Sequence, residues 1–582
     1  MFRRKYLPLW PFVMIIAGIL TLQAQQESKT ANERVREISG IVVNESGQPM
    51  PGVGVFISSS SQQSIKTTTA ADGSFKVGGL EQAIYTVLAY APTYVNLFRN
   101  PSDPTNYYAP GDSIRLKLVK GSVLTGTVTT SSGEPVIGVT VRAFLVRDQD
   151  GHVPSFRMQQ AGERTTDDRG VYRIYGLPAG SYLVAAGGSY DDPNSLSAYD
   201  YDAPTYAPSS NRDTGAEFVV GPGEELANVD IKYRAEPGHK ISGTAKARDA
   251  NSSFSITLSS SSTGTSVRSS FQSAESRGFM FTGVPDDTYD VSATSNSGDV
   301  VGLSDPIKVA VKGMDVTGLE LLTKPLASIA GRFLLVNSKA PECAGNRPLS
   351  FAEVLVTALR EGQKTQTDAF ANMYFSGSPT VPEKDGNFIF RNLRPGKYSI
   401  IPRMFARYWY VQSIKLPAAV QSTGAALGNA GRSGVELKSG DRVNGVTINL
   451  AEGAASVRGS IVTTDSENRP SNLYLYLVPV ERESADDPLR FFAVQIEHDG
   501  KFAINNLPPG RYWALIRTAA DKEMKLVQSP GESETRAKIL REAEATRSAI
   551  ELKPCQNIPD YKLTLKSVSV LRYLQSTIKR LV

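Results

Sequence analysis

The sequence predicts an all-β fold: a tandem array of about five β-sandwich domains, with one short helix near the C-terminus. A motif that ends in tyrosine occurs five times, and the gaps between these tyrosines are 97, 107, 109 and 114 residues, a domain length. Short stretches of alternating polarity lie between Gly- and Pro-rich turns, with almost no helical periodicity. The 582-residue length suits about four to six domains.

The N-terminus has the order of charged, apolar and small residues that is typical of a secretory signal peptide. Arg3-Arg4-Lys5 is followed by an apolar run over 7–22, and cleavage is expected after Ala24. The alternative is an uncleaved membrane anchor, but the run is shorter than the roughly 20 residues that a bilayer requires. We therefore expect an exported chain that is periplasmic, on the outer surface or secreted, with no transmembrane segment once residues 1–24 are removed.

The first half of each repeat reads as a strand, a tight turn and a second strand. In the second repeat Gly126-Thr127-Val128 precedes Gly133-Glu134-Pro135 and then Gly138-Val139-Thr140-Val141, and the same pattern begins at Gly40 in the first repeat. β-branched residues favour strands, while glycine and proline favour the turn because of their backbone dihedrals.

The second half opens with Asp-Gly, which predicts a type I′ hairpin turn. It then gives a strand with alternating bulky residues, a Leu-Pro-x-Gly turn and a closing strand that contains the tyrosine. The opening turns are Asp72-Gly73, Asp385-Gly386 and Asp499-Gly500, and Asp168-Arg169-Gly170 is one residue longer. Bulky side chains such as Phe388 and Phe390 should share the inward face.

A structural role is predicted for the repeated tyrosines, with ligand contact as the alternative. A tyrosine at this place in a sandwich buries its ring and hydrogen-bonds its hydroxyl to nearby backbone. The tyrosines are Tyr85, Tyr182, Tyr289, Tyr398 and Tyr512.

The repeats and a final alternating strand in each set the expected domain boundaries. The expected segments are a signal peptide (1–24), repeat 1 (35–120), repeat 2 (121–235), the degenerate repeat 3 (236–325), repeat 4 (326–452), repeat 5 (453–566) with an inserted helix (532–546), and a tail (567–582). In the helix, Ala537, Leu540 and Ala543 should face the last sandwich.

The motif resembles the carboxypeptidase regulatory-like domain, a prealbumin-like, immunoglobulin-like sandwich found in tandem in bacterial exported proteins. The residues that carry the resemblance are Gly126-x-Val128, Pro135-x-x-Gly138-Val139-x-Val141, Gly170-x-Tyr172, Leu177-Pro178-x-Gly180-x-Tyr182 and their counterparts. It extends over nearly all of residues 35–566, although repeat 3 is assigned mostly by position. The resemblance implies a carbohydrate-binding-like fold and an accessory domain rather than a peptidase.

No catalytic motif is recognisable in the sequence. Its three histidines, His152, His239 and His498, do not begin the H-E-x-x-H pattern of a zinc peptidase, and G-x-S-x-G, P-loop and dinucleotide motifs are missing. Only a triad assembled across the fold would escape this inspection. A net charge of +5 without long basic runs argues against nucleic acid as a partner. We therefore expect a non-enzyme with no cofactor and no metal.

Cys343 and Cys555 are the only cysteines in the sequence, and it leaves their state open. An exported protein permits a disulfide, but two cysteines so far apart can equally remain unpaired.

The predicted ligand site is the tyrosine-rich acidic loop that follows the closing strand of repeat 2. Aromatic faces can stack on a sugar ring while carboxylates bind its hydroxyls, so we expect carbohydrate binding, with a polysaccharide or an envelope protein as partner. The alternative is a structural spacer or protein–protein adhesion array without a small ligand. The loop residues are Tyr190, Asp191, Asp192, Tyr199, Asp200, Tyr201, Asp202 and Tyr206.

Overall fold

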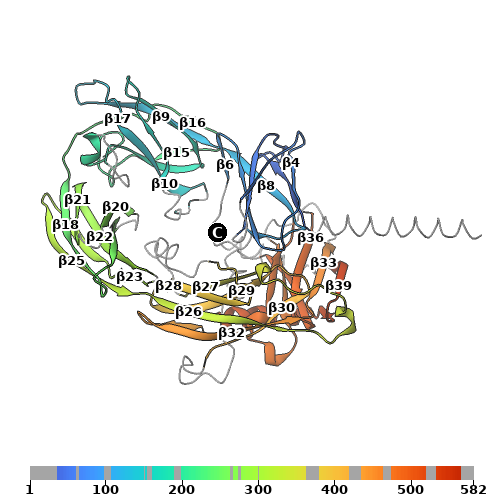
Figure 1. Ribbon diagram of the computed structural model, residues 1–582. Coiled ribbons are helices and arrows are strands. Elements are labelled where there is room, and N and C mark those ends of the chain that lie inside the picture. The colour runs from blue at the N-terminus through green and yellow to red at the C-terminus, as the bar shows by residue number, and fades with distance from the viewer. Residues whose placement is uncertain are drawn as a thin grey trace, which may run out of the picture. The chain divides into compact units, whose positions relative to one another are not determined.

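The computed structural model is an all-β protein with a single long helix among the residues that it describes (Figure 1). The described residues are 36–59, 64–96, 107–149, 151, 153, 160–188, 198–261, 266–272, 277–298, 300–361, 379–417, 434–462, 473–497, 499–518 and 532–564. The predicted signal peptide and the tail lie outside these ranges. Within them, no helix is both long enough and apolar enough to span a bilayer.

Repeats 1 and 2 each contain two layers of strands. Repeat 1 consists of β1 (Ile38–Val43), β2 (Gly54–Ser58), β3 (Ile65–Thr68), β4 (Ser74–Val77), β5 (Tyr85–Tyr90), β6 (Tyr94–Asn96), β7 (Tyr107–Tyr108) and β8 (Ser113–Lys120), in the orders β4-β1-β8-β6 and β3-β2-β5-β7. Repeat 2 consists of β9 (Ser122–Thr129), β10 (Thr140–Asp148), β11 (Gln160–Thr165), β12 (Val171–Leu177), β13 (Gly180–Ala186), the 3-10 helix η2 (Ala198–Tyr201), β14 (Thr205–Tyr206), β15 (Phe218–Val220), β16 (Glu225–Leu226) and β17 (Ile231–Lys232). Its orders are β12-β9-β16 and β11-β10-β13-β14, with β17 on β9 and β15 on β13.

Repeat 3 differs from the expected pair of separate sheets, because its strands form one eight-stranded sheet. The strands are β18 (His239–Lys246), β19 (Ser253–Ser260), β20 (Ser266–Gln272), β21 (Gly278–Val284), β22 (Asp287–Ser297), β23 (Val300–Ser304), β24 (Ile307–Val311) and β25 (Val316–Pro325). The short strand β23 pairs with both β22 and β25 and so joins the two layers. A common core still lies between them, with Ile241 and Leu321 from one side and Ile256 and Val291 from the other.

Repeats 4 and 5 again have separate sheets. Repeat 4 consists of β26 (Ala327–Val336), η3 (Pro341–Cys343), η4 (Phe351–Glu353), β27 (Val354–Arg360), β28 (Asn387–Leu393), β29 (Gly396–Met404), β30 (Trp409–Lys415), β31 (Val435–Leu437) and β32 (Arg442–Glu452). Repeat 5 consists of β33 (Ala455–Val462), β34 (Leu473–Pro479), η6 (Arg482–Ser484), η7 (Pro488–Arg490), β35 (Phe492–Gln495), β36 (Lys501–Leu507), β37 (Gly510–Thr518), α6 (Ser533–Thr546), β38 (Ala549–Leu552) and β39 (Asn557–Thr564). The sheet orders are β28-β26-β32-β30, β27-β29-β31, β36-β33-β39 and β35-β34-β37-β38.

The first and last strands of every repeat are parallel neighbours. These pairs are β1 with β8, β9 with β17, β18 with β25, β26 with β32, and β33 with β39. Because the paired strands run in the same direction, the chain enters a repeat at one end of the pair and leaves at the other end. Each repeat is thus closed by its own two terminal strands.

A glycine in the first strand allows this pairing to be close. A β-carbon placed on Gly459 would lie 2.0 Å from the carbonyl oxygen of Tyr561 in the last strand and 2.8 Å from the ring of Phe502. The corresponding clashes with a carbonyl oxygen occur at 2.1–2.4 Å for Gly40, Gly126, Gly243 and Gly331; the oxygen belongs to the last strand in three of these repeats and to Val229, just before β17, in repeat 2. Real β-carbons do not approach an oxygen so closely, so only glycine fits these positions.

The Asp-Gly turns are not the type I′ turns that the sequence predicts. In the first repeat the Gly73 amide donates to the Ala70 carbonyl, and among Asp72 and Gly73 only the glycine has positive φ, +74°. A type I′ turn would require positive φ at both central residues, whereas this geometry is a type I turn followed by a left-handed glycine. The Asp72 carboxylate instead accepts the Ser74 amide at 3.0 Å.

The longer Asp-Arg-Gly copy forms the same turn without an extra residue. Gly170 donates to the Asp167 carbonyl, as Gly386 does to Glu383 and Gly500 to Glu497. In this copy the first residue of the turn, Asp167, supplies the carboxylate, which accepts the amides of Arg169 and Val171.

All five repeated tyrosines have buried rings, with at most 2% of their surface exposed. The hydroxyls of Tyr85, Tyr289 and Tyr512 donate to the carbonyl oxygen four residues earlier, at 3.2, 2.9 and 2.9 Å. Each of these three side chains therefore fastens the turn before the closing strand to the core.

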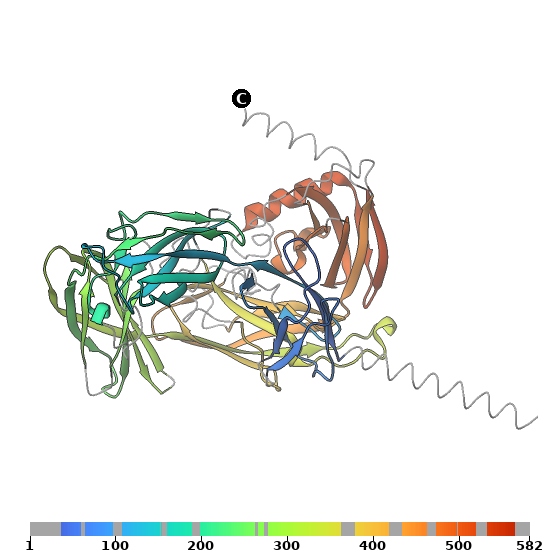
Figure 2. The same ribbon diagram turned by 90° about the horizontal axis from the view of Figure 1, so that it is seen from above.

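The predicted helix near the C-terminus is confirmed as α6, which covers the sheet that contains β34 and β37 (Figure 2). Its buried face is partly as predicted: Ala543 is buried and Leu540 packs against the sheet, whereas Ala537 is exposed and Arg536 and Ile539 are buried instead. The Arg536 guanidinium pairs with Asp486 at 2.7 Å, so an ion pair rather than an alanine occupies the first inward turn.

Replacing Gly459 by alanine should destabilise repeat 5, since its added β-carbon has no room between the Tyr561 carbonyl and the Phe502 ring. We expect a loss of about 1–3 kcal/mol, the usual cost of overpacking a core. Hydrogen exchange of the β33 and β39 amides should accelerate accordingly. Gly78→Ala is the matched control, because nothing lies within 4 Å of that position; equal effects of both substitutions would contradict the packing argument.

Alkaline pH should destabilise repeat 4 through Tyr398. Burial raises the pKa of this phenol to about 12, whereas an unfolded tyrosine has a pKa of about 10. The folded state therefore binds the proton more tightly than the unfolded state. The stability that this difference contributes is fully present below about pH 10 and is lost as the pH rises toward about 12. Thermal unfolding between these pH values should show a smaller pH dependence in Tyr398→Phe; an unchanged dependence would refute this assignment.

Candidate functional site

The predicted tyrosine-rich loop of repeat 2 is described only in its second part. Tyr190, Asp191 and Asp192 lie outside the described residues, and so does the side chain of Asp200. Tyr199 and Tyr201 lie on η2, Asp202 follows it, and Tyr206 ends β14. The structure therefore allows four of the eight predicted side chains to be compared.

Tyr199 and Asp202 bind their own domain through Tyr233. The rings of Tyr199 and Tyr233 meet edge to face, with centroids 5.5 Å apart. The Tyr233 hydroxyl donates to the Asp202 carboxylate at 2.9 Å. These contacts already engage the Tyr199 ring and one oxygen of the Asp202 carboxylate within the domain.

A buried arginine holds the start of the same loop. Arg142 of β10 is 8% exposed, and its guanidinium donates to the carbonyl oxygens of Gly187 and Gly188 at 3.2 and 2.5 Å. It also pairs with the Glu163 carboxylate at 3.2 Å. The Gly188 amide in turn donates to the Tyr199 carbonyl at 2.9 Å, which ties η2 to this arginine.

Tyr206 is a core residue, with 5% of its surface exposed. It packs with Leu183 and Ala185 of β13, and its ring lies 6.2 Å from that of Phe144. Tyr201 differs from its neighbours because 66% of its surface is exposed. Of the four comparable side chains, it is the one that presents an aromatic ring to solvent.

A small pocket lies beside Tyr206, between repeat 2 and repeat 3. Its lining residues are Pro204, Tyr206, Asn211, Arg212, Asp213, Ser260, Pro285, Asp286, Asp287 and Tyr289. The pocket has a volume of about 30 Å³, which suits one or two water molecules rather than an enclosed sugar ring. Two of its carboxylates already have partners, since Asp286 accepts the Gly313 amide and Asp287 the Thr288 amide.

His239 is the histidine whose side chain the structure describes. Its imidazole nitrogens lie 3.3 Å from Asp286 and 3.9 Å from Asp315. Across the described ranges, no group of three or more His, Cys, Asp or Glu side chains could hold a metal ion.

Tyr233 and Arg142 bind described residues of the loop from outside it, and neither was predicted from the sequence. Tyr233 follows the last strand of repeat 2, and Arg142 interrupts an apolar strand pattern. An arginine in the run Val141-Arg142-Ala143 was the available signal, because a buried guanidinium requires several acceptors.

A family model supports the resemblance inferred from the repeated motif. Residues 37–100, most of repeat 1, match the carboxypeptidase regulatory-like domain. No curated protein matches the sequence.

Several solved bacterial structures show a low degree of similarity to this chain. The TIE protein of Bacillus anthracis has a TM-score of 0.14 and 17% identity, and the match covers 50% of this chain and 51% of that one. A streptococcal ancillary pilin has a TM-score of 0.17 and 11% identity, and the match covers 50% of this chain and 99% of the pilin. The Bacillus cereus major pilin subunit BcpA has a TM-score of 0.13 and 13% identity, and the match covers 50% of this chain and 99% of BcpA. TM-scores so far below 0.5 indicate nothing about the role of this chain.

Proposed function

We propose that this chain is an exported, non-catalytic structural protein, a spacer of five domains that carries tension along its length. The parallel pairing of the first and last strand in all five repeats carries the proposal. Tension on the chain pulls these two strands in opposite directions along their length. The backbone hydrogen bonds of the ladder run across the strands, so they resist this sliding together instead of opening one by one.

The short connections between repeats support the same function. A single residue, Gly121, separates β8 from β9, and Leu326 alone separates β25 from β26. Two residues, Gly453 and Ala454, separate β32 from β33. Connectors of this length add little slack, so tension passes directly from one domain to the next. The proposal uses the domain boundaries predicted above, and each of the five ranges contains one parallel pair.

Export is supported by the bond between Cys343 and Cys555, because disulfides persist mainly in oxidising compartments outside the cytoplasm. The basic and apolar N-terminus has the character of a cleavable leader. The absence of a recognisable catalytic motif in the sequence supports a non-catalytic role. Hydrolysis of a peptide or glycan that one point substitution abolishes would contradict that role.

Glycan binding at the repeat 2 loop is a second candidate function, and the exposed ring of Tyr201 favours it. An envelope protein is the alternative partner of this loop. Both remain secondary because Tyr199, Asp202 and Tyr206 already pack within the domain.

Pulling the chain by its ends should unfold repeats 1–3 in separate events, with repeat 2 yielding at the lowest force. Its terminal pair has only two residues in register, Ile231 and Lys232 with Val128 and Thr129, whereas five positions pair in repeat 1. Single-molecule force spectroscopy measures this order.

The matched control applies the force to repeat 2 through Thr140 and Thr165, opposite residues at one end of the antiparallel β10–β11 pair. There the hydrogen bonds open in sequence, so the rupture force should be several-fold lower than for end-to-end pulling. Equal forces in the two directions would contradict the proposed function.

If the loop binds glycans, Tyr201→Ala should weaken binding to a polysaccharide at least tenfold, since stacking depends on the exposed ring. Tyr175→Ala removes another exposed tyrosine of repeat 2 and is the control. Calorimetry of the full chain against a polysaccharide panel tests this. Absence of binding by the unsubstituted chain would eliminate the candidate.

A further inference from the structure

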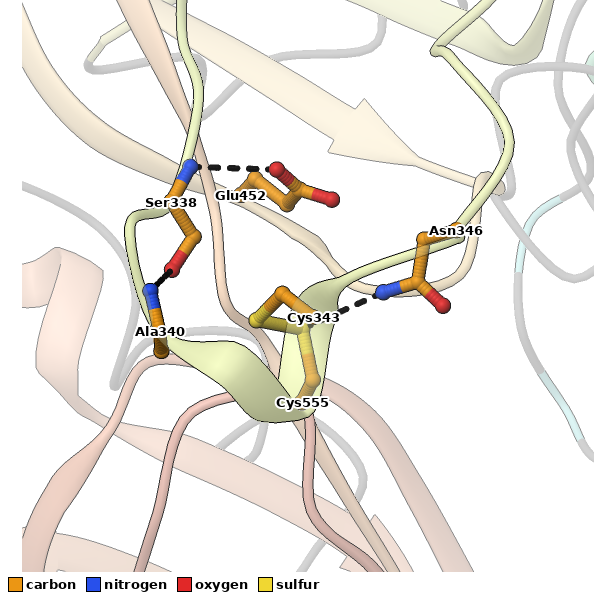
Figure 3. Close-up of a disulfide and its surroundings, with 6 residues drawn as sticks. All are labelled: Ser338, Ala340, Cys343, Asn346, Glu452 and Cys555. Atoms are coloured by element: carbon orange, nitrogen blue, oxygen red, sulfur yellow. Dashed lines mark hydrogen bonds between the residues drawn. A yellow bond between two sulfur atoms is a disulfide. The ribbon is translucent and has the colours of Figure 1, made fainter.

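The two cysteines form a covalent bridge between repeats 4 and 5. Cys343 ends η3, in the segment that follows the first strand of repeat 4, and Cys555 lies just before the last strand of repeat 5 (Figure 3). Their Cα atoms are 5.3 Å apart, within the usual range for a disulfide. The Asn346 side-chain amide donates to the Cys555 sulfur at 3.3 Å, and both cysteines are buried.

The connector between the two repeats is held from both sides. The amides of Gly453 and Ala454 both donate to the Tyr408 carbonyl of repeat 4, at 2.7 and 2.9 Å. The Gly453 carbonyl accepts the Cys555 amide of repeat 5 at 3.0 Å. The connector therefore cannot straighten without breaking bonds in both domains.

Asn506 adds a side-chain bond from repeat 5 back to repeat 4. Its amide donates to the carbonyl oxygens of Ala406 and Trp409, at 2.6 and 2.9 Å. Asn506 has a φ of +59°, and the same left-handed position is filled by Gly79, Gly176, Gly283 and Asn392 in the other repeats. In repeat 5 the residue that makes this turn thus also binds the preceding domain. Leu489 of η7 packs against the repeat 4 core and completes the junction.

We infer that the disulfide gives tension a path around repeats 4 and 5 and so protects their interiors from being unfolded by force. This inference rests on the proposed function. Tension that enters through β26 reaches Cys343, crosses the sulfur–sulfur bond to Cys555 and leaves through β39. The bridge spans 212 positions of sequence, and everything between its two ends is excluded from this path.

Chain order makes this path possible. In repeat 4 only β26 precedes the bridge, and in repeat 5 only β39 follows it, while β27–β38 and α6 lie between the cysteines. With the bridge intact, force can extract the two terminal strands but cannot extend the segment between them. The bridge therefore limits how far the C-terminal part of the described chain can lengthen.

Force spectroscopy of the full chain, pulled by its ends with and without a thiol reductant, tests the inference. The reduced chain should release additional length of about 700–760 Å, which corresponds to the 212 bridged positions at roughly 3.3–3.6 Å each. Cys343→Ser/Cys555→Ser should release the same length without reductant, and reductant should not change that variant further.

Length distinguishes a tension path from simple stabilisation. If reduction lowered the unfolding force but left the total released length unchanged, the bond would not lie in the path of the tension, and the inference would be overturned. Reactive Cys343 and Cys555 thiols in the untreated, unfolded chain would overturn it as well. Low rupture forces in the unbridged repeats 1–3 would instead refute the proposed function, while the length difference would still establish the path.

Asn506→Gly separates the role of the junction from that of the bridge. Glycine keeps the left-handed turn but removes the two bonds to repeat 4. The oxidised variant should therefore keep the restricted length, because the covalent path is intact. Asn392→Gly, at the equivalent turn of repeat 4, is its control. Release of the full bridged length by oxidised Asn506→Gly would contradict the assignment of the limit to the disulfide.

Discussion

The close parallel pairing of the first and last strand of each repeat is the constraint on which the rest of the structure depends. It requires a glycine in the first strand, because the carbonyl oxygen of the last strand occupies the space of a side chain, as Tyr561 does at Gly459. It also fixes where the chain enters and leaves, at opposite ends of one ladder. The remaining strands complete the two layers around this pair, so they can differ in number and even merge, as they do in repeat 3.

The sequence was sufficient for the fold class because the informative interactions are local. The alternation in Ser113–Lys120 predicts an inward face, and Ile114, Leu116 and Leu118 are indeed buried there. The turn before each tyrosine is also local, since hydroxyls such as that of Tyr512 bind a carbonyl only four residues away. The predicted type I′ geometry of the Asp-Gly turns was wrong because Asp-Gly fits two turn geometries, and the strands on either side of the turn decide between them.

The rest could not be predicted, because it depends on contacts between residues far apart in the sequence. The loop of repeat 2 has the composition of a sugar site, but the described residues Gly188 and Asp202 are bound by Arg142 and Tyr233, which lie outside it. The inward face of α6 depends on Asp486, about fifty residues before Arg536. The pairing of Cys343 with Cys555 requires the tertiary fold, since two cysteines 212 positions apart carry no local signal.

A domain closed by its own terminal strands has a further consequence for how neighbouring domains can be joined. Because the first and last strands of a repeat pair with each other, neighbouring repeats can be connected by one or two residues, as at Gly121 and Leu326, and bonds between repeats add to this pairing. Between repeats 4 and 5, the bonds start from positions that every repeat has. The left-handed residue before the closing turn is Asn506 here, and the residue just before the last strand region is Cys555. Substitutions at such positions can therefore bond one pair of neighbouring repeats together without changing the strand order of either repeat.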